Sequence, residues 1–153
     1  MTGYFKVSTF CSCTLIERSA KVNKLHAHIT PGEYSWIGAS SGVRGLNLNY
    51  VVTQDECVAE LYIDRGKDAE AENKAIFDQL FAHKAEIDAS FGESLSWERL
   101  EGKRACRIRH TQTGGGYRSP EDNWPAVQDA IILDMDRLEK ALRPHLKQLK
   151  LNA

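Results

Sequence analysis

The chain lacks a long hydrophobic run, because no apolar stretch in its 153 residues approaches the roughly 20 residues of a membrane span. It also lacks an excess of one charge, since 20 Lys and Arg stand against 21 Asp and Glu, for a formal net charge of −1. This balance excludes a protein that holds nucleic acid by overall charge alone, although it leaves room for a local basic patch. Internal repeats, low-complexity tracts and linkers are absent too. We therefore expect a single domain with no membrane partner.

The start of the chain lacks the features of a secretory signal peptide, since residues 1–16 carry one lysine and no continuous apolar block. A cytoplasmic protein is the expectation, and its four cysteines should then be free thiols. The first residues have little periodicity. We therefore expect a poorly ordered or atypical segment over residues 1–13 and one domain over residues 14–153.

The most informative pattern that is present lies in residues 57–64, CVAELYID. Its odd positions are apolar, whereas its even positions become polar toward the end. A strand points alternate side chains to opposite faces of a sheet. One face should therefore pack on a core, and the other should carry Glu60 beside Tyr62.

The remaining elements follow from periodicity and turn residues. Alternation and short connections predict an antiparallel meander and a later hairpin, and three- and four-residue spacing predicts the helices. The expected strands span residues 34–40, 46–52, 57–64, 95–100 and 103–111, and the expected helices span 12–22, 68–91 and 123–149. Pro144 should kink the last helix or end it early. The fold class is therefore α+β, with about five mostly antiparallel strands in the order α-β-β-β-α-β-β-α and helices packed on the sheet.

Arginines form a row on the second arm of the hairpin. Arg107 and Arg109 lie two residues apart and should project from one face, and Arg118 follows in the next loop. Such a row can contact phosphates. Glu98 and Glu60 can instead neutralise it across strands, and the near-zero net charge favours that pairing. The candidate binding residues on this basis are Asn49, Tyr62, Arg107, Arg109 and Arg118.

A restriction-endonuclease-like core has a similar order of elements, and its chemistry needs Asp/Glu-x-Lys on the third strand plus an earlier acid to hold Mg²⁺. Glu60 fits the third strand, but Tyr62 stands where the lysine is needed. The second strand offers Asn47 and Asn49 in place of an acid. The metal triad is incomplete, so the sequence leaves open whether the chain is an enzyme, and Mg²⁺ is expected only if this alternative holds.

A zinc site is a weaker alternative. Cys11-x-Cys13 and His26-x-His28 supply four suitable ligands, but their spacing of one residue differs from the usual two to four. The other three histidines are scattered, and the pattern assigns them no chemistry. We expect no resident cofactor.

Glycines and tryptophans have structural interpretations. Gly114-Gly115-Gly116 lacks the Gly-Lys-Ser/Thr of a P-loop, which favours a flexible hinge over an anion cradle. Trp36, Trp97 and Trp124 are in phase with apolar neighbours and should pack in the core or on the sheet. A base-stacking platform would need two exposed aromatics on one sheet face, and only Tyr62 is expected there.

Several long blocks make the chain resemble the DUF4268 family, a bacterial and archaeal domain of unknown function. The blocks are WIGASSGVRGL, VAELYIDRG, NKAIFDQLFAHKAEID, LSWERLEGKRACRIR and WPAVQDAIILDMDRLEKALRPHLKQL. The resemblance covers roughly residues 14–149. It implies no assigned activity, but similar domains often end longer proteins, some with nuclease-like or restriction-related neighbours.

Three hypotheses follow. The first is a non-catalytic recognition module in a nucleic-acid-related or defence-type system, with nucleic acid or a nuclease-type protein as its partner. The second is a divergent Mg²⁺-dependent nuclease centred on Glu60. The third is a structural homodimer formed through the last helix.

Overall fold

One antiparallel sheet of five strands organises the molecule, which is described by a computed structural model over residues 15–29 and 36–151. The spatial order is β1-β2-β3-β5-β4. The strands are β1 (Trp36–Val43), β2 (Leu46–Val52), β3 (Cys57–Ile63), β4 (Ser96–Glu98) and β5 (Cys106–Gln112). The predicted α+β fold with a five-stranded antiparallel sheet is confirmed. The expected disorder of residues 1–13 lies outside the described residues.

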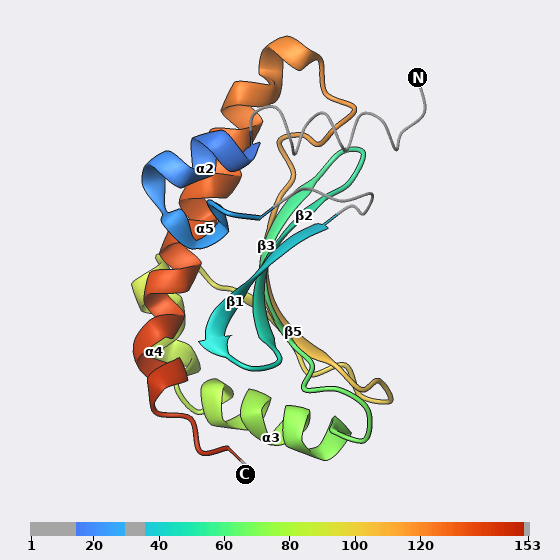
Figure 1. Ribbon diagram of the computed structural model, residues 1–153, viewed down its shortest axis with the longest axis vertical. Helices are drawn as coiled ribbons and strands as arrows, with labels where there is room; N and C mark the ends of the chain where they lie inside the picture. The colour runs from blue at the N-terminus through green and yellow to red at the C-terminus, as the bar shows by residue number, and fades with distance from the viewer. Residues whose placement is uncertain (1–14, 30–35, 152–153) are drawn as a thin grey trace.

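The helices of the described residues gather on one side of the sheet, as Figure 1 shows. They are α2 (Ile16–Val22), α3 (Glu70–Phe81), α4 (Lys84–Phe91) and α5 (Trp124–Lys147), with short 3₁₀ turns at Lys24–His26 and Glu121–Asn123. None of the helices between residues 15 and 151 that the structure describes has the length and apolarity to cross a membrane.

The core lies between the helices and the apolar face of the sheet. All four odd positions of β3, which are Cys57, Ala59, Leu61 and Ile63, have no exposed surface. These four side chains belong to the core cluster, whereas Val58 and Glu60, which are also only 4% exposed, do not, so the predicted alternation between a core face and an opposite face is confirmed. Helix α5 contributes most of the opposing layer, and it contacts β3, β2 and β5 along its length.

The single helix expected over residues 68–91 is wrong. The chain leaves helical geometry at His83, where φ is −108° and ψ is 20°, so that α3 and α4 are separate helices. Leu80 and Ile87 are both buried. Helix α3 packs against β5 and β3, whereas α4 packs against α5. The two helices serve different surfaces, and a continuous apolar stripe in the sequence does not reveal this change of direction.

Helix α5 passes through Pro144, which was expected either to kink the helix or to end it early. The helix continues to Lys147 with Pro144 inside its last turn. A proline at that place removes only one intrahelical hydrogen bond. Leu142 and Leu146 are buried on either side of it, so packing on the core offsets the loss.

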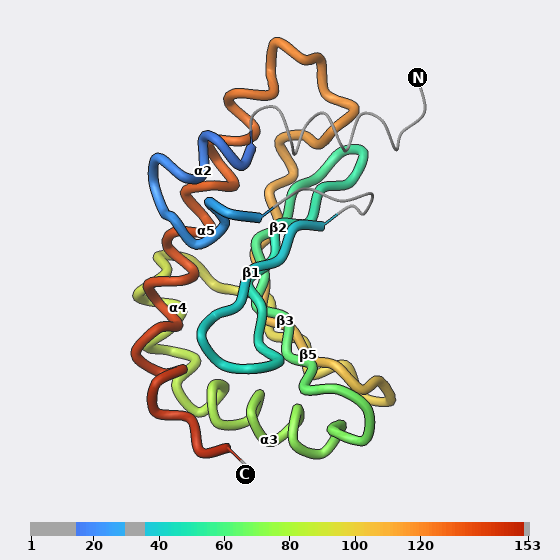
Figure 2. Tube along the Cα trace, in the orientation of Figure 1, coloured from blue at the N-terminus to red at the C-terminus, as the bar shows by residue number. Residues whose placement is uncertain are grey.

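The loop after β5 is docked on the β2–β3 turn. The N–H groups of Tyr117 and Arg118 donate to the carbonyl oxygens of Thr53 and Gln54, each at 3.0 Å. Figure 2 shows the loop running beside this turn. A Cβ on Gly116 would lie 2.1 Å from the Thr53 oxygen. The glycine therefore permits a close backbone approach, and the docked N–H groups are engaged by carbonyls, which supports neither a hinge nor an anion cradle.

Candidate binding face of the sheet

The polar side chains of three strands meet on the face of the sheet opposite the core. The register places Glu60 of β3 between Asn49 of β2 and Arg109 of β5. Tyr62 is likewise opposite Arg107. Since residues directly across antiparallel strands share a face, these side chains form one surface. No described helix covers this surface (Figure 1).

An ion pair forms the floor of this surface. Arg109 Nη2 donates to Glu60 Oε1 at 2.6 Å, and the side chains are 17% and 5% exposed. Asn49 Nδ2 donates to the second carboxylate oxygen of Glu60 at 3.3 Å. Both carboxylate oxygens of Glu60 therefore accept a hydrogen bond. This agrees with the expected pairing of Glu60 with an arginine on a neighbouring strand.

A second ion pair lies nearer to solvent. Arg107 Nη2 is 2.8 Å from Glu98 Oε1, and their side chains are 32% and 26% exposed. At the same edge, Arg104 Nη2 lies 2.6 Å from Asp64 Oδ2. Burial alone would raise the pKa of Asp64, but hydrogen bonds from Arg104 and the Gly66 N–H hold it below its usual range. The three arginines and three carboxylates balance, so this face attracts no ligand by net charge.

The face is hollowed into a pocket of about 420 Å³. Its lining residues are Trp36, Gly45, Asn47, Asn49, Val51, Glu60, Tyr62, Asp64, Arg107 and Arg109. Trp36 is 48% exposed, so of its two expected positions, in the core or on the sheet, the core position is excluded. Ile37 and Ala39 are buried instead, which puts Trp36 on the same face as Gly38 and the polar residues. Two aromatic side chains therefore share this sheet face.

Gly38 makes room for the arrangement. A Cβ at this position would lie 2.4 Å from Asn49 Oδ1 and 3.2 Å from the ring of Trp36. A larger residue would push Asn49 away from Glu60 or displace the tryptophan. The Gly in the expected strand 34–40 is thus a condition for the pocket.

Two buried polar atoms of the pocket residues have no hydrogen-bond partner among the described residues. They are the Oδ1 of Asn49 and the Nε of Arg109. A buried polar atom without a partner costs free energy and calls for an explanation in a native structure. Both atoms belong to side chains that line the pocket but lie beneath its surface.

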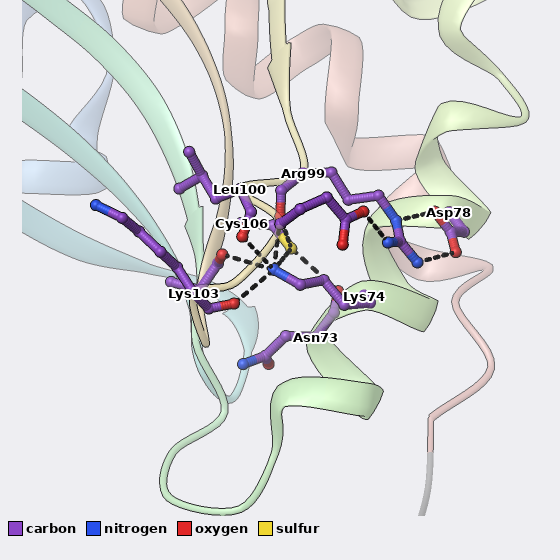
Figure 3. Close-up of polar contacts among 9 residues, drawn as sticks. Asn73, Lys74, Asp78, Arg99, Leu100, Lys103 and Cys106 are labelled. Carbon is purple, nitrogen blue, oxygen red and sulfur yellow. Dashed lines mark hydrogen bonds and ion pairs between the residues drawn. The ribbon is translucent and has the colours of Figure 1, made fainter.

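Lys74 of α3 holds the loop that joins β4 and β5, as Figure 3 shows. Its Nζ donates to the carbonyl oxygens of Arg99 at 2.6 Å, Leu100 at 3.0 Å, Lys103 at 2.7 Å and Ala105 at 3.2 Å. The sequence pattern did not predict this role. A lysine in the middle of a buried helical stripe, next to Asn73 and Ile76, is the signal that could have indicated it.

Arg118 lies apart from the other candidate binding residues. Its backbone N–H is bound at the β2–β3 turn, and its side chain is not part of the pocket lining. The structure therefore brings together Asn49, Tyr62, Arg107 and Arg109, while the binding role of all five stays a prediction.

The structure describes only two of the four residues of the alternative zinc site, His26 and His28. Cys11 and Cys13 lie outside the described residues. His26 is buried, and its Nε2 lies 2.8 Å from the carbonyl oxygen of Leu48. Burial lowers the pKa of His26, although the Leu48 bond acts in the opposite direction. One nitrogen of this histidine is thus engaged, while His28 is exposed.

Glu60 is also poorly placed for nuclease chemistry. Within the part of the chain that the structure describes, Glu60 belongs to no group of three His, Cys, Asp or Glu residues with converging ligand atoms. A two-metal or one-metal phosphodiesterase site needs several such oxygens around the ion. The geometry favours Glu60 as the partner of Arg109.

Comparisons with known proteins place the chain by sequence. The family model described as "Domain of unknown function (DUF4268)" matches residues 13–146. No curated protein matches. Among solved structures, the chain is similar to the crystal structure of YbjN from E. coli, with 11% identity over 88% of this chain and 93% of that chain and a TM-score of 0.38. A similarity of this strength carries no argument about function.

Proposed function

This chain belongs to the DUF4268 family of domains of unknown function, and we propose that it is a non-catalytic recognition module that binds single-stranded nucleic acid through the polar face of its sheet. The observation that carries the proposal is the presence of Trp36 and Tyr62 in one pocket with Arg107 and Arg109. Aromatic rings and guanidinium planes on a sheet face are what unpaired bases stack on.

The charges of the pocket favour contacts to the bases of a nucleic acid over contacts to a row of its backbone phosphates. Glu60 and Glu98 neutralise the two arginines, so the pocket cannot rely on a strong positive potential. Asn49 and Arg109 line the pocket, and amide and guanidinium groups are those that hydrogen-bond to base edges. Binding should therefore depend on salt only weakly, with a slope of about −1 to −2 in a plot of log affinity against log salt, at roughly 0.7 per phosphate contact.

Fluorescence anisotropy with labelled single-stranded and double-stranded DNA and RNA tests the proposal. The wild-type chain should bind single strands. Trp36→Ala plus Tyr62→Ala, which keeps every charge, should weaken binding about tenfold or more, because each stacked base contributes about 1–3 kcal/mol. Arg107→Ala plus Arg109→Ala should weaken it as well.

Arg143→Ala plus Lys147→Ala is the matched control, because it removes the same charge from exposed positions of α5 on the helical layer. Circular dichroism confirms that each variant folds. Absence of binding to every oligonucleotide, or affinity unchanged by both sheet-face variants, would overturn the proposal. Strand cleavage with Mg²⁺ or Mn²⁺ that is lost in Glu60→Ala would favour the nuclease alternative instead.

The homodimer alternative has less apolar surface available than the sequence indicated. The predicted stripe of α5 is buried in the core at Ile131, Met135, Leu138 and Leu142. Leu133, at 55% exposed, is the large apolar side chain that this helix turns outward among the described residues. Light scattering measures the oligomeric state and tests this alternative.

A further inference from the structure

Three side chains with metal-binding atoms meet where the junction of α3 and α4 approaches the last turn of α5. They are His83, Glu86 and His145, and their nearest ligand atoms all lie within 4.8 Å of one another. We propose that they form a site for a divalent transition metal of the zinc class. The site lies on the helical layer, so it is independent of the sheet face.

The two separations that involve Glu86 are close to those of tetrahedral coordination, and the two histidine nitrogens lie within 4.8 Å of each other. Glu86 Oε2 lies 3.7 Å from His83 Nδ1 and 3.9 Å from His145 Nε2. Ligands at about 2.1 Å from a tetrahedral zinc lie roughly 3.4 Å from one another. The side chains of His83 and Glu86 are 45% and 71% exposed, so they are free to close this difference.

Backbone structure holds the ligands in position. His83 directly precedes α4, and Glu86 follows it by three residues, which places the two side chains on one face. Helix α4 packs along α5, so that His145 faces them from the other helix. The imidazole rings of His83 and His145 lie with their centroids 4.8 Å apart, although 62 positions separate them in the sequence.

His83, which is exposed, and His145, which is half-buried, are also less engaged in hydrogen bonds than His26 and His110. His26 is bonded to the carbonyl oxygen of Leu48, and His110 lies 2.8 Å from Asp134. His145 has a buried Nδ1 with no hydrogen-bond partner among the described residues, and its Nε2 faces Glu86. Coordination at His145 would therefore break no hydrogen bond that the described residues make.

The donor set determines the class of ion. Two imidazoles and one carboxylate match the ligands of zinc and its neighbours in the transition series, whereas Mg²⁺ and Ca²⁺ prefer oxygen atoms alone. Three protein ligands leave a fourth position for water or another small ligand. A pocket of about 510 Å³ adjoins His83 and His145 and gives that ligand room.

Calorimetric titration of the chelator-treated full chain with ZnCl₂, and visible absorption with CoCl₂, tests the site. The wild-type chain should bind a single equivalent of each ion. Glu86→Gln and His83→Ala plus His145→Ala should each weaken binding at least about tenfold, since loss of a supporting group alone weakens metal sites 10- to 100-fold. Zinc should raise the melting temperature of the wild-type chain and not that of the double variant.

Two controls separate this site from other ligands in the chain. His28→Ala removes an exposed histidine outside the cluster, and Cys11→Ser plus Cys13→Ser removes the thiols of the alternative zinc pattern. Full binding in these controls supports the proposal. Absence of binding in the wild-type chain, full binding in the His83→Ala plus His145→Ala variant, or loss of binding in the cysteine variant would overturn it.

Discussion

At the scale of single residues, Lys74 is a buried polar side chain that binds four carbonyl oxygens of one loop. A buried amino group is tolerated only when hydrogen bonds replace its water, and here backbone carbonyls surround it. They belong to a loop in which Leu100 has a φ of 54°, a conformation that non-glycine residues rarely adopt. Such strain persists only where the surroundings hold it. Lys74 therefore keeps this loop, and with it strands β4 and β5, in place.

Lys74→Met should lower the free energy of unfolding by about 2–4 kcal/mol, because it leaves carbonyl oxygens unpaired at a buried position. Urea denaturation measures the change. Lys147→Met replaces an exposed lysine of α5 and should change stability by less than about 0.5 kcal/mol. If Lys74→Met lowers the free energy of unfolding no more than Lys147→Met does, the hydrogen bonds from Lys74 to the loop carbonyls make no net contribution to stability.

At the scale of elements, glycine positions decide how the loop after β5 meets the β2–β3 turn. Gly116 is buried against the backbone of Thr53 and Gln54, whereas a Cβ on Gly114 would meet nothing within 4 Å. The two glycines are two residues apart in one loop, and only one of them is required by packing. Periodicity cannot distinguish them, because the difference lies in a contact with another element.

Gly116→Ala should destabilise the protein by about 1–3 kcal/mol, because the added methyl forces the loop away from the turn and breaks the bonds made by Tyr117 and Arg118. Gly114→Ala is the matched control and should be neutral or slightly stabilising, since it restricts the unfolded chain. Thermal and urea unfolding compare the two. Equal destabilisation of both variants would contradict the assigned close approach.

At the scale of the whole molecule, aspartates in ion pairs connect the helical layer to the edge of the sheet and make stability dependent on pH. Asp88 of α4 accepts hydrogen bonds from Lys84 at 2.7 Å and from the indole N–H of Trp97 at 3.0 Å. Burial alone would raise the pKa of Asp88, but these bonds and the Leu95 N–H hold it below its usual range. The pKa of Asp78 is lowered too, chiefly by its hydrogen bonds from Arg99.

A carboxyl whose pKa is lower in the folded than in the unfolded state stabilises the fold above its ordinary pKa, and this contribution is lost as the pH falls through the folded value. Stability should therefore decrease below about pH 4, the ordinary value for aspartate. Asp88→Asn should lose stability at pH 6.5 and show a smaller further loss at pH 3, as measured by urea unfolding. Asp55→Asn, at an exposed turn, should leave the pH profile unchanged. An identical acid loss in wild type and Asp88→Asn would rule out this linkage.

The local pattern of the sequence determined the strand-rich half of the fold and much of its binding face. Alternation in β3 was sufficient to assign Leu61 to the core and Glu60 to the opposite face, because a strand has a period of two whatever surrounds it. Short connections set the antiparallel neighbours β1–β2, β2–β3 and β4–β5. The pairing of β3 with β5, which puts Arg109 beside Glu60, joins strands that α3, α4 and β4 separate in the sequence, so tertiary structure decided it.

Tertiary structure decided what depends on contacts between distant segments. It turned Trp36 outward, divided the predicted helix at His83, placed the tip of Lys74 among loop carbonyls and brought His145 to Glu86. None of these has a local period to reveal it. Each results from the packing of one element against another, and such packing overrides local preference because burial and hydrogen bonding across elements contribute more free energy than the propensity of a single residue.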